Sequence, residues 1–176
     1  YTTLSDLTRD IGYTDMPEYT AGLNTGFSWK NFDFSMQWTG AWNVDRMLDE
    51  FRRPLGDTNE KGLLLYQYDT TWRSSADTFT AKFPRTSSLH ASNNYAGSDL
   101  YLINASYLRL KSVEIGYNFN FPFMKKLKMD NCRLYVNGYN LITITGFKWG
   151  DPESRQSSRP NYPLTRVFNI GLKLGF

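Results

Sequence analysis

The last eleven residues of the chain alternate between two kinds of side chain, and this pattern constrains the fold more than any other feature. The residues of one parity are Arg166, Phe168, Ile170, Leu172, Leu174 and Phe176. The residues between them are Val167, Asn169, Gly171, Lys173 and Gly175. Successive side chains of a strand point to opposite faces, and a tilted strand needs roughly 9–11 residues to cross a bilayer. We therefore predict a strand over residues 165–176 whose two faces meet different surroundings.

A second alternating region consists of two strands, predicted at residues 23–30 and 32–42, around the polar connection 30–31. Two alternating runs separated by such a short connection are typical of a hairpin. The aromatic residues Trp29 and Phe32 flank the connection, and aromatic rings are common where strands meet a membrane interface. Alternation alone also fits a sheet that packs on a soluble core, so the pattern by itself leaves both interpretations open.

Two more strands are predicted at residues 106–120 and 131–145. The parity of the apolar residues changes after Leu110, which indicates a β-bulge or the end of the membrane-facing part. Polar stretches rich in proline, serine and asparagine are predicted as loops at 43–104 and 146–163. A loop of about sixty residues is uncommon in a compact soluble domain, whereas outer-membrane barrels combine long outer loops with short periplasmic turns.

The composition excludes several classes of function. The net charge is +3 with no basic cluster, so a nucleic-acid partner is not expected. One cysteine, Cys132, and one histidine, His90, give no basis for a disulfide, a metal site or another cofactor. No apolar run approaches the roughly 18–20 residues of a membrane helix.

These strands predict an all-β fold, namely a transmembrane antiparallel β-barrel to which the chain contributes about five strands. Five strands cannot close a barrel, and open edges in lipid would leave backbone groups without hydrogen bonds. The chain begins with Tyr1 rather than methionine, and we expect the plug and the earlier strands to come from a longer protein.

The C-terminal octet resembles the insertion signal of bacterial outer-membrane proteins. The matching positions are Asn169, Gly171, Leu174 and Phe176. The resemblance implies that the barrel-assembly machinery recognises this strand during insertion.

Longer segments resemble the SusC-like, or RagA-like, TonB-dependent transporters of Bacteroidetes. The segments are residues 104–117 (NASYLRLKSVEIGY), 133–141 (RLYVNGYNL), 150–153 (GDPE) and 162–166 (YPLTR). The resemblance implies that the chain forms the last five strands of a 22-stranded barrel filled by a plug. It places the 30–31 turn in the periplasm and the two long loops outside the cell.

The same resemblance implies a function. Such a protein is integral to the outer membrane of a Gram-negative bacterium. It imports oligosaccharides or peptides together with a SusD-like surface lipoprotein, and the TonB complex acts through the plug. No reaction is catalysed by the barrel, so an enzyme is not expected.

Three alternatives remain from the sequence. The first is a TonB-dependent receptor for siderophores or vitamins, and the second is a soluble carbohydrate-binding β-sandwich. The third is a glycosidase with paired carboxylates. No acidic residue lies in a recognisable catalytic motif, and Glu114 on the polar side of a strand fits a lumen-facing charge better than a general acid.

Aromatic and arginine residues of the loops are the candidates for contact with the substrate or the lid. They are Trp72, Arg73, Arg85, Trp149 and Tyr162. Such side chains can stack on sugar rings or pair with carboxylates. The alternative for each is that it packs one loop against another.

Overall fold

The computed structural model describes residues 15–47, 65–85, 99–122, 128–154 and 164–176. Contacts between Cα atoms divide the chain into two units. The sheet unit contains Pro17–Asn43, Ala105–Ser154 and Tyr162–Phe176, and the loop unit contains Val44–Asn104 with two shorter segments. We describe each unit by itself.

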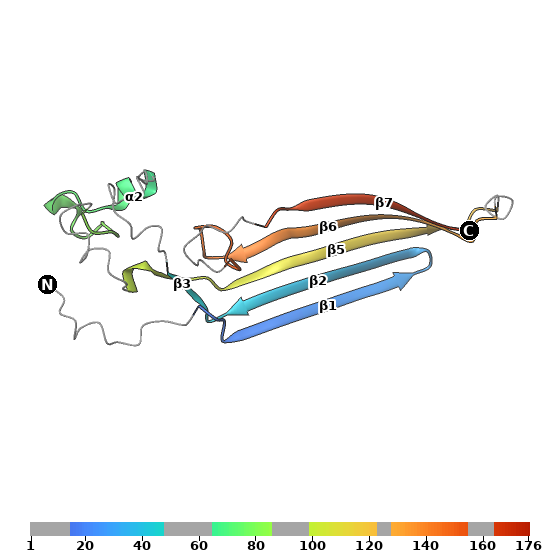
Figure 1. Cartoon of the computed structure of the whole chain (residues 1–176), viewed down its shortest axis with the longest axis horizontal. Coiled ribbons are helices and arrows are strands. Elements are labelled where there is room, and N and C mark those ends of the chain that lie inside the picture. The colour runs from blue at the N-terminus through green and yellow to red at the C-terminus, as the bar shows by residue number, and fades with distance from the viewer. Residues whose placement is uncertain (1–14, 48–64, 86–98, 123–127, 155–163) are drawn as a thin grey trace. The chain divides into compact units, whose positions relative to one another are not determined.

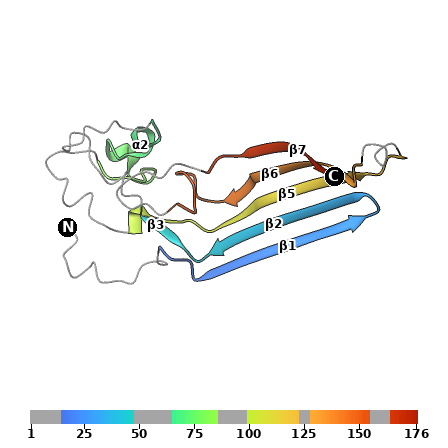
Figure 2. The same ribbon diagram turned by 45° about the vertical axis from the view of Figure 1, so that its right-hand side comes forward.

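The sheet unit is one antiparallel sheet of five strands, β1-β2-β5-β6-β7, and each strand pairs with its neighbours in chain order. The strands are β1 (Tyr19–Trp29), β2 (Phe32–Trp42), β5 (Tyr107–Phe119), β6 (Asn131–Thr145) and β7 (Val167–Gly175). Figures 1 and 2 show them side by side, with the β1–β2 turn and the end of β7 at the same end of the sheet. The prediction of an all-β, antiparallel fold is confirmed.

The boundaries of β2 and β6 coincide with the ranges 32–42 and 131–145 expected from the sequence. The largest difference is in β1, which begins at Tyr19 and not at residue 23. Its first residues pair with the end of β2, where Thr20 lies opposite Ala41 and Gly22 opposite Thr39. Backbone hydrogen bonds form this part of the ladder, and its small side chains give no apolar alternation in the sequence.

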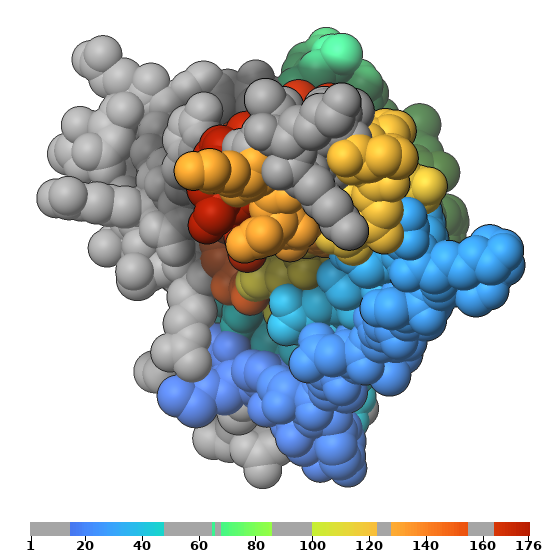
Figure 3. Space-filling model, turned by 90° about the vertical axis from the view of Figure 1, so that its right-hand side faces the viewer, coloured from blue at the N-terminus to red at the C-terminus, as the bar shows by residue number. Residues whose placement is uncertain are grey.

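The two faces of the sheet differ completely in chemistry. Because paired residues share a face, the register defines an apolar face and a polar face across all five strands. The apolar face carries Leu23, Phe27, Trp29, Phe34, Met36, Trp38, Val113, Ile115, Tyr117, Leu134, Val136, Ile142, Phe168, Ile170 and Leu172. Figure 3, viewed from the end that holds the β1–β2 turn, shows the strands following one another around a curve.

Aromatic residues lie at both ends of the apolar face of the β1–β2 hairpin. Trp29 pairs with Phe32 next to the turn, and Tyr19 pairs with Trp42 at the other end. The eleven residues of β2 extend for about 33 Å, which at a tilt of about 45° spans about 23 Å along the bilayer normal. This agrees with the apolar band of roughly 25 Å, bordered by aromatic residues, of outer-membrane barrels.

The expected irregularity after Leu110 is a β-bulge. Against β2, Leu110 pairs with Trp38 and Ser112 with Gln37, so Lys111 is an extra residue. Because of this extra residue, Leu110 and Val113 both lie on the apolar face although they are three positions apart in the sequence.

The facing of residues 131–145, ambiguous in the sequence, follows from a second irregularity in β6. Leu110 pairs with Ile142, while Ser112 pairs with Tyr139, so Asn140 and Leu141 lie opposite the bulge. Asn140 has a φ of +53°, a left-handed conformation that asparagine tolerates well. The backbone therefore changes direction here, two residues after Gly138.

The loop unit contains short regular elements where the sequence predicted a single loop over residues 43–104. The two strands β3 (Asp45–Met47) and β4 (Leu102–Asn104) pair with each other. The helices are α2 (Leu65–Thr70), η2 (Ser75–Asp77) and η3 (Asp99–Tyr101). A short helix or strand was expected within residues 61–68, and α2 overlaps that range, whereas three-residue strands and single helical turns are too short to show a period in the sequence.

Few apolar side chains of the described residues are buried: Ala41, Val44, Tyr101, Ala105, Leu110 and Phe147. Many of the larger apolar residues are exposed instead, among them Phe168 at 72% and Ile170 at 74%. None of the helices in the described ranges has the length and apolar character required to span a bilayer.

Candidate functional site

The polar face of the sheet is the candidate functional surface, because it carries the charged residues of the strands. Its residues include Asn24, Ser28, Asp33, Ser35, Gln37, Arg109, Ser112, Glu114, Asn118, Arg133, Asn137, Thr143, Asn169 and Lys173. Many of them are joined by hydrogen bonds in two groups, one nearer each end of the strands.

The first group, the cross-strand network, consists of Asp33, Glu114, Asn118, Arg133, Asn137 and Asn169. Arg133 donates to both oxygens of Asp33, with an Nε–Oδ1 distance of 3.1 Å, and to Oε1 of Glu114 at 2.8 Å. Asn137 donates to Oε2 of Glu114 at 3.2 Å and accepts from Asn169 at 2.9 Å. The network therefore ties β2, β5, β6 and β7 together through side chains.

Two glycines make room for the side chains of this face. Arg133 is paired with Asn118 but reaches Asp33 two strands away, so its guanidinium crosses above Gly116. A Cβ at position 116 would overlap that guanidinium. Tyr135 in the same way lies over Gly171, its direct partner on β7. A side chain at either position would therefore displace the guanidinium of Arg133 or the ring of Tyr135.

The second group, the loop cluster, consists of Arg109, Lys111, Thr143, Asp151 and Glu153. Arg109 is only 2% exposed. Its Nη2 donates to Oδ1 of Asp151 at 2.6 Å, and its Nη1 donates to Oε2 of Glu153 at 2.7 Å. Its Nε donates to Thr143 on the neighbouring strand at 3.0 Å. Every nitrogen of the guanidinium therefore has a partner, as a buried arginine requires.

The two carboxylates of the loop cluster differ in their surroundings. Asp151 is 8% exposed and also accepts hydrogen bonds from the backbone N–H groups of Glu153 and Leu164, at 2.9 and 3.3 Å. Glu153 is 37% exposed and forms a second ion pair with Lys111, with a distance of 3.5 Å from Nζ to Oε1. Asp151 thus holds the loop in place, whereas Glu153 lies at its surface.

Burial alone would raise the pKa of Asp151. The hydrogen bond from Arg109, the backbone N–H groups and the charge of the guanidinium outweigh burial and hold this pKa below its ordinary value of 3.8. The carboxylate is therefore ionised over the whole neutral range.

The arrangement provides groups that can form hydrogen bonds and ion pairs. The acids of both groups are paired with arginine or lysine, which is typical of structural or lining charges. In the described ranges, no three potential ligands among histidine, cysteine, aspartate and glutamate come close enough to hold a metal ion. The paired charges, amides and hydroxyl groups of this face can form hydrogen bonds with polar molecules.

Of the five loop residues predicted to contact substrate or lid, three lie in the loop unit. Trp72 is half-buried, while Arg73 and Arg85 are exposed. The guanidinium of Arg73 lies 4.8 Å from the ring centre of Tyr68 at the end of α2.

The other two candidates belong to the sheet unit. Trp149 is half-buried in the loop after β6. Tyr162 lies outside the described residues. The substrate or lid contacts of all five residues stay predictions.

Comparison with known proteins identifies relatives of this chain. It is 28% identical over 190 residues to the TonB-dependent receptor P3 of Formosa agariphila, and this match covers 98% of the chain and 18% of the relative. It is also 28% identical to the TonB-dependent receptor SusC of Bacteroides thetaiotaomicron, over 88% of the chain and 15% of that relative. The chain is related to the SusC-like TonB-dependent receptors.

Solved structures give the same answer for the fold. The structure of the RagAB peptide importer in the open-open state matches 99% of the chain with a TM-score of 0.76 and 22% identity. The closed-closed state of the same importer matches with the same TM-score. These matches cover 19% of that chain, so the five strands correspond to a fragment of a barrel transporter. No family model matches the sequence.

The relatives are named as receptors and importers rather than as enzymes. In this chain, the four residues of the terminal signal lie on or beside β7. Asn169 bonds to Asn137, Gly171 lies under Tyr135, and Leu174 pairs with Cys132. Phe176 is 81% exposed. Their recognition by the assembly machinery stays a prediction.

The loop cluster was not predicted from the sequence. Arg109 stood out only as a polar residue between Leu108 and Leu110, and Asp151 and Glu153 only as part of a family-like loop. The available signal was an arginine of a strand's polar parity together with a downstream Asp-Pro-Glu, but nothing in the sequence aligns two segments about forty residues apart.

Proposed function

We propose that the chain forms part of the wall of an outer-membrane, TonB-dependent importer. The single observation that supports this most strongly is the sheet itself. It has one apolar face bordered by aromatic residues at both ends of β1 and β2, and one polar face joined by hydrogen bonds. A sheet of this kind fits between lipid on one side and an aqueous lumen on the other.

The open edges support the same proposal. Within the described residues, β1 and β7 each pair with a single strand of the five-stranded sheet. An unpaired edge in lipid is costly because backbone N–H and C=O groups lack partners, so further strands must complete the wall. The matches to 15–19% of the length of the relatives fit this arrangement.

The proposed cargo is an oligosaccharide or a peptide, taken up together with a SusD-like surface lipoprotein. The peptide class is supported by the similarity to a peptide importer, and the oligosaccharide class rests on the sequence resemblance to SusC-like transporters. In this proposal the β1–β2 turn faces the periplasm, and the loops at 43–104 and 146–163 face the outside. The polar face lines the lumen around a plug through which TonB acts, and the loop candidates, including Trp72 and Trp149, contact cargo or lid.

The test begins with purification of the full-length protein that contains this chain from the outer membrane, in mild detergent and without added ligand. We expect a surface lipoprotein to co-purify, and we expect mass spectrometry to identify a bound oligosaccharide or peptide. Recovery of the protein only from the soluble fraction would contradict the proposal.

Growth of a deletion strain separates the cargo classes. Loss of growth on one class of oligosaccharide or on peptides, restored by the wild-type gene, is the expected result. A defect confined to iron-limited or vitamin-limited medium would instead identify a siderophore or vitamin receptor. The matched control is a strain complemented with a gene that lacks the TonB-contacting segment, which we expect not to grow.

A further inference from the structure

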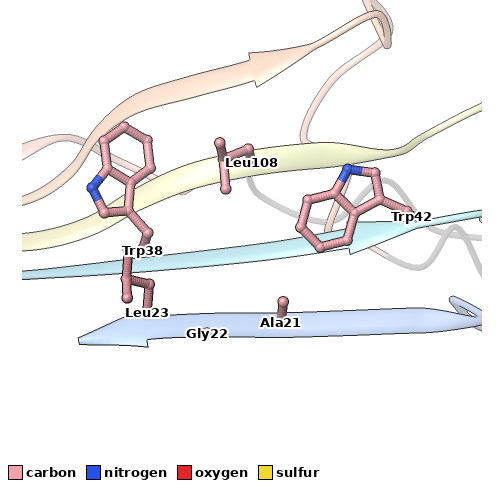
Figure 4. Close-up of a pocket in the computed structure, with 6 residues that line it drawn as sticks. All are labelled: Ala21, Gly22, Leu23, Trp38, Trp42 and Leu108. Carbon is pink, nitrogen blue, oxygen red and sulfur yellow. The ribbon is translucent and has the colours of Figure 1, made fainter.

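An apolar groove crosses three strands on the apolar face, near the end of the sheet away from the β1–β2 turn. Its volume is about 340 Å³, and it is lined by Ala21, Gly22, Leu23, Trp38, Trp42 and Leu108. In Figure 4 the indole rings of Trp38 and Trp42 stand on the same side of β2, with Leu108 of the neighbouring strand between them.

The register explains why this part of the face is hollow. Ala21 pairs with Gly40, and Gly40 pairs on its other side with Leu108. Of these three neighbouring residues, only Leu108 has a large side chain, so the face is hollow at this row. Tryptophans lie on β2 two positions before and two positions after Gly40, about 13 Å apart along the strand. A Cβ at position 40 would lie 2.6 Å from Cη2 of Trp42, so glycine allows the ring of Trp42 to lie against the sheet.

The chemistry of the lining selects an apolar ligand. None of the lining residues is charged, and the only polar side-chain atoms among them are the two indole N–H groups. A sugar or a peptide would lose hydrogen bonds to water on entering the groove and would find too few in return. An unbranched hydrocarbon chain loses none, and each methylene group that leaves water contributes favourably.

The position of the groove identifies the source of such a chain. The groove continues the apolar face, and the Tyr19–Trp42 pair beside it marks the end of the apolar band of β1 and β2. Aromatic residues of this kind lie at the depth of lipid headgroups. We propose that the groove binds one acyl chain of a membrane lipid, in the leaflet on the side of the long loops. This rests on the proposed function, which places the apolar face in the membrane.

The groove between the two tryptophans fits one acyl chain better than it fits the surface of a second protein. A stable interface between two copies would bury roughly 800 Å² on each partner. The groove is confined to a few residues of β1, β2 and β5. A second copy on this face is therefore an outcome that the experiment must distinguish.

The experiment compares the full-length wild-type transporter with two variants of β1. Ala21→Leu adds a side chain inside the groove. Thr25→Leu, the matched control, adds apolar bulk on the same face and strand but opposite Met36, away from the groove. Each protein is purified from the outer membrane, and lipid A, the acylated lipid of the outer leaflet, is titrated while bound lipids are counted by native mass spectrometry.

We expect the wild type and Thr25→Leu to retain one tightly bound lipid with dissociation constants within about twofold of each other. Ala21→Leu should weaken this lipid about tenfold, because the new side chain displaces about two methylene groups. Uptake of cargo should be unchanged in both variants, since neither residue faces the lumen.

Equal lipid retention by Ala21→Leu and the wild type would overturn the proposal, and so would an equal loss in Ala21→Leu and Thr25→Leu. Dissociation of a second copy by Ala21→Leu, with the lipid count unchanged, would overturn it in favour of a subunit interface. Absence of the wild type from the outer membrane would overturn the proposed function, and this proposal with it. Weaker lipid binding by Ala21→Leu with normal uptake of cargo would support the groove proposal and leave the proposed function unaffected.

Discussion

Replacement of Arg109 by methionine should release the loop after β6 without unfolding the sheet. Methionine retains much of the apolar stem of arginine but removes the guanidinium. The substitution deletes the hydrogen bonds to Thr143, Asp151 and Glu153. The carboxylate of Asp151 then remains almost buried without its cationic partner.

The magnitude follows from the two carboxylates. Breaking a buried ion pair by removing one partner costs about 3–5 kcal/mol. Asp151 keeps two backbone N–H donors, from Glu153 and Leu164, which offset part of the loss. Glu153 is more than one-third exposed and can return to water, so its contribution is small. We expect the free energy of opening of the loop to fall by about 2–3 kcal/mol.

Amide hydrogen exchange of the full-length transporter in detergent measures this opening. Each 1.4 kcal/mol corresponds to about a tenfold change in the opening equilibrium, so exchange of the Glu153 and Leu164 amides should accelerate about 30- to 150-fold. Amides of β2 and β7 should exchange at the wild-type rate. Lys111→Met is the matched control, because it removes only a 3.5 Å ion pair between half-exposed groups and should change exchange less than threefold.

Exchange of these two amides within about twofold of the wild-type rate in Arg109→Met would refute the reasoning. So would an equal acceleration in Arg109→Met and Lys111→Met, because it would show that burial of the arginine contributes nothing. Arg109→Lys should lie between the wild type and Arg109→Met, since one ammonium group cannot bond both carboxylates and Thr143 together.

Three other predictions follow from the same surfaces. Because the pKa of Asp151 is lowered in the folded loop, its stabilisation should be complete above pH about 4 and be lost as the pH falls through that lowered pKa, measured as protection of the Glu153 amide corrected for intrinsic exchange. Gly116→Val should displace Arg133 from Asp33 and lower the free energy of unfolding of the barrel by about 1–3 kcal/mol in urea titrations. Deletion of Phe176 should lower the amount of assembled barrel in the outer membrane, measured by heat-modifiable electrophoresis, while transcript levels stay constant.

Each of these has a control and an outcome that would contradict it. Protection of the Glu153 amide that is unchanged to well below pH 3.8 in both the wild type and Asp151→Asn would show that the carboxylate does not hold the loop. Ser112→Val, on the same face of β5, is the control for Gly116→Val, and equal destabilisation by both would exclude a specific clash. Normal barrel levels after deletion of Phe176 would count against the insertion signal, and Phe121→Ala controls for loss of an exposed aromatic residue.

The strands were predictable because lipid and water impose opposite chemistry on alternate residues. That rule located β2 and showed that the parity of β5 changes near Leu110. It failed for the start of β1, where Thr20, Ala21 and Gly22 are small, and for β3 and β4, which have three residues each. Pairing of these segments depends on backbone hydrogen bonds, which leave little trace in the side chains.

The cross-strand network and the loop cluster were harder to predict from the sequence. The alternation placed Glu114 on the polar face, but its partner Arg133 lies on another strand, and Asp33 lies on a third. Such partners are decided by the register between strands, and the bulge at Lys111 changes that register by one residue. The loop cluster depends in addition on how the loop after β6 folds back, which no periodic pattern encodes.

The bulge at Lys111 also bears on how such a wall can change length during evolution. Without this residue, Leu110 would be followed directly by Ser112 and Val113, and the alternation of β5 would run unbroken. Leu108, Leu110 and Val113 would still share one face, so loss of the residue would not turn the strand inside out. A deletion of one residue at this point is therefore tolerable, whereas elsewhere in β5 it would exchange the two faces for all the side chains beyond it. Length differences among related transporters should accordingly concentrate at position 111 within this strand.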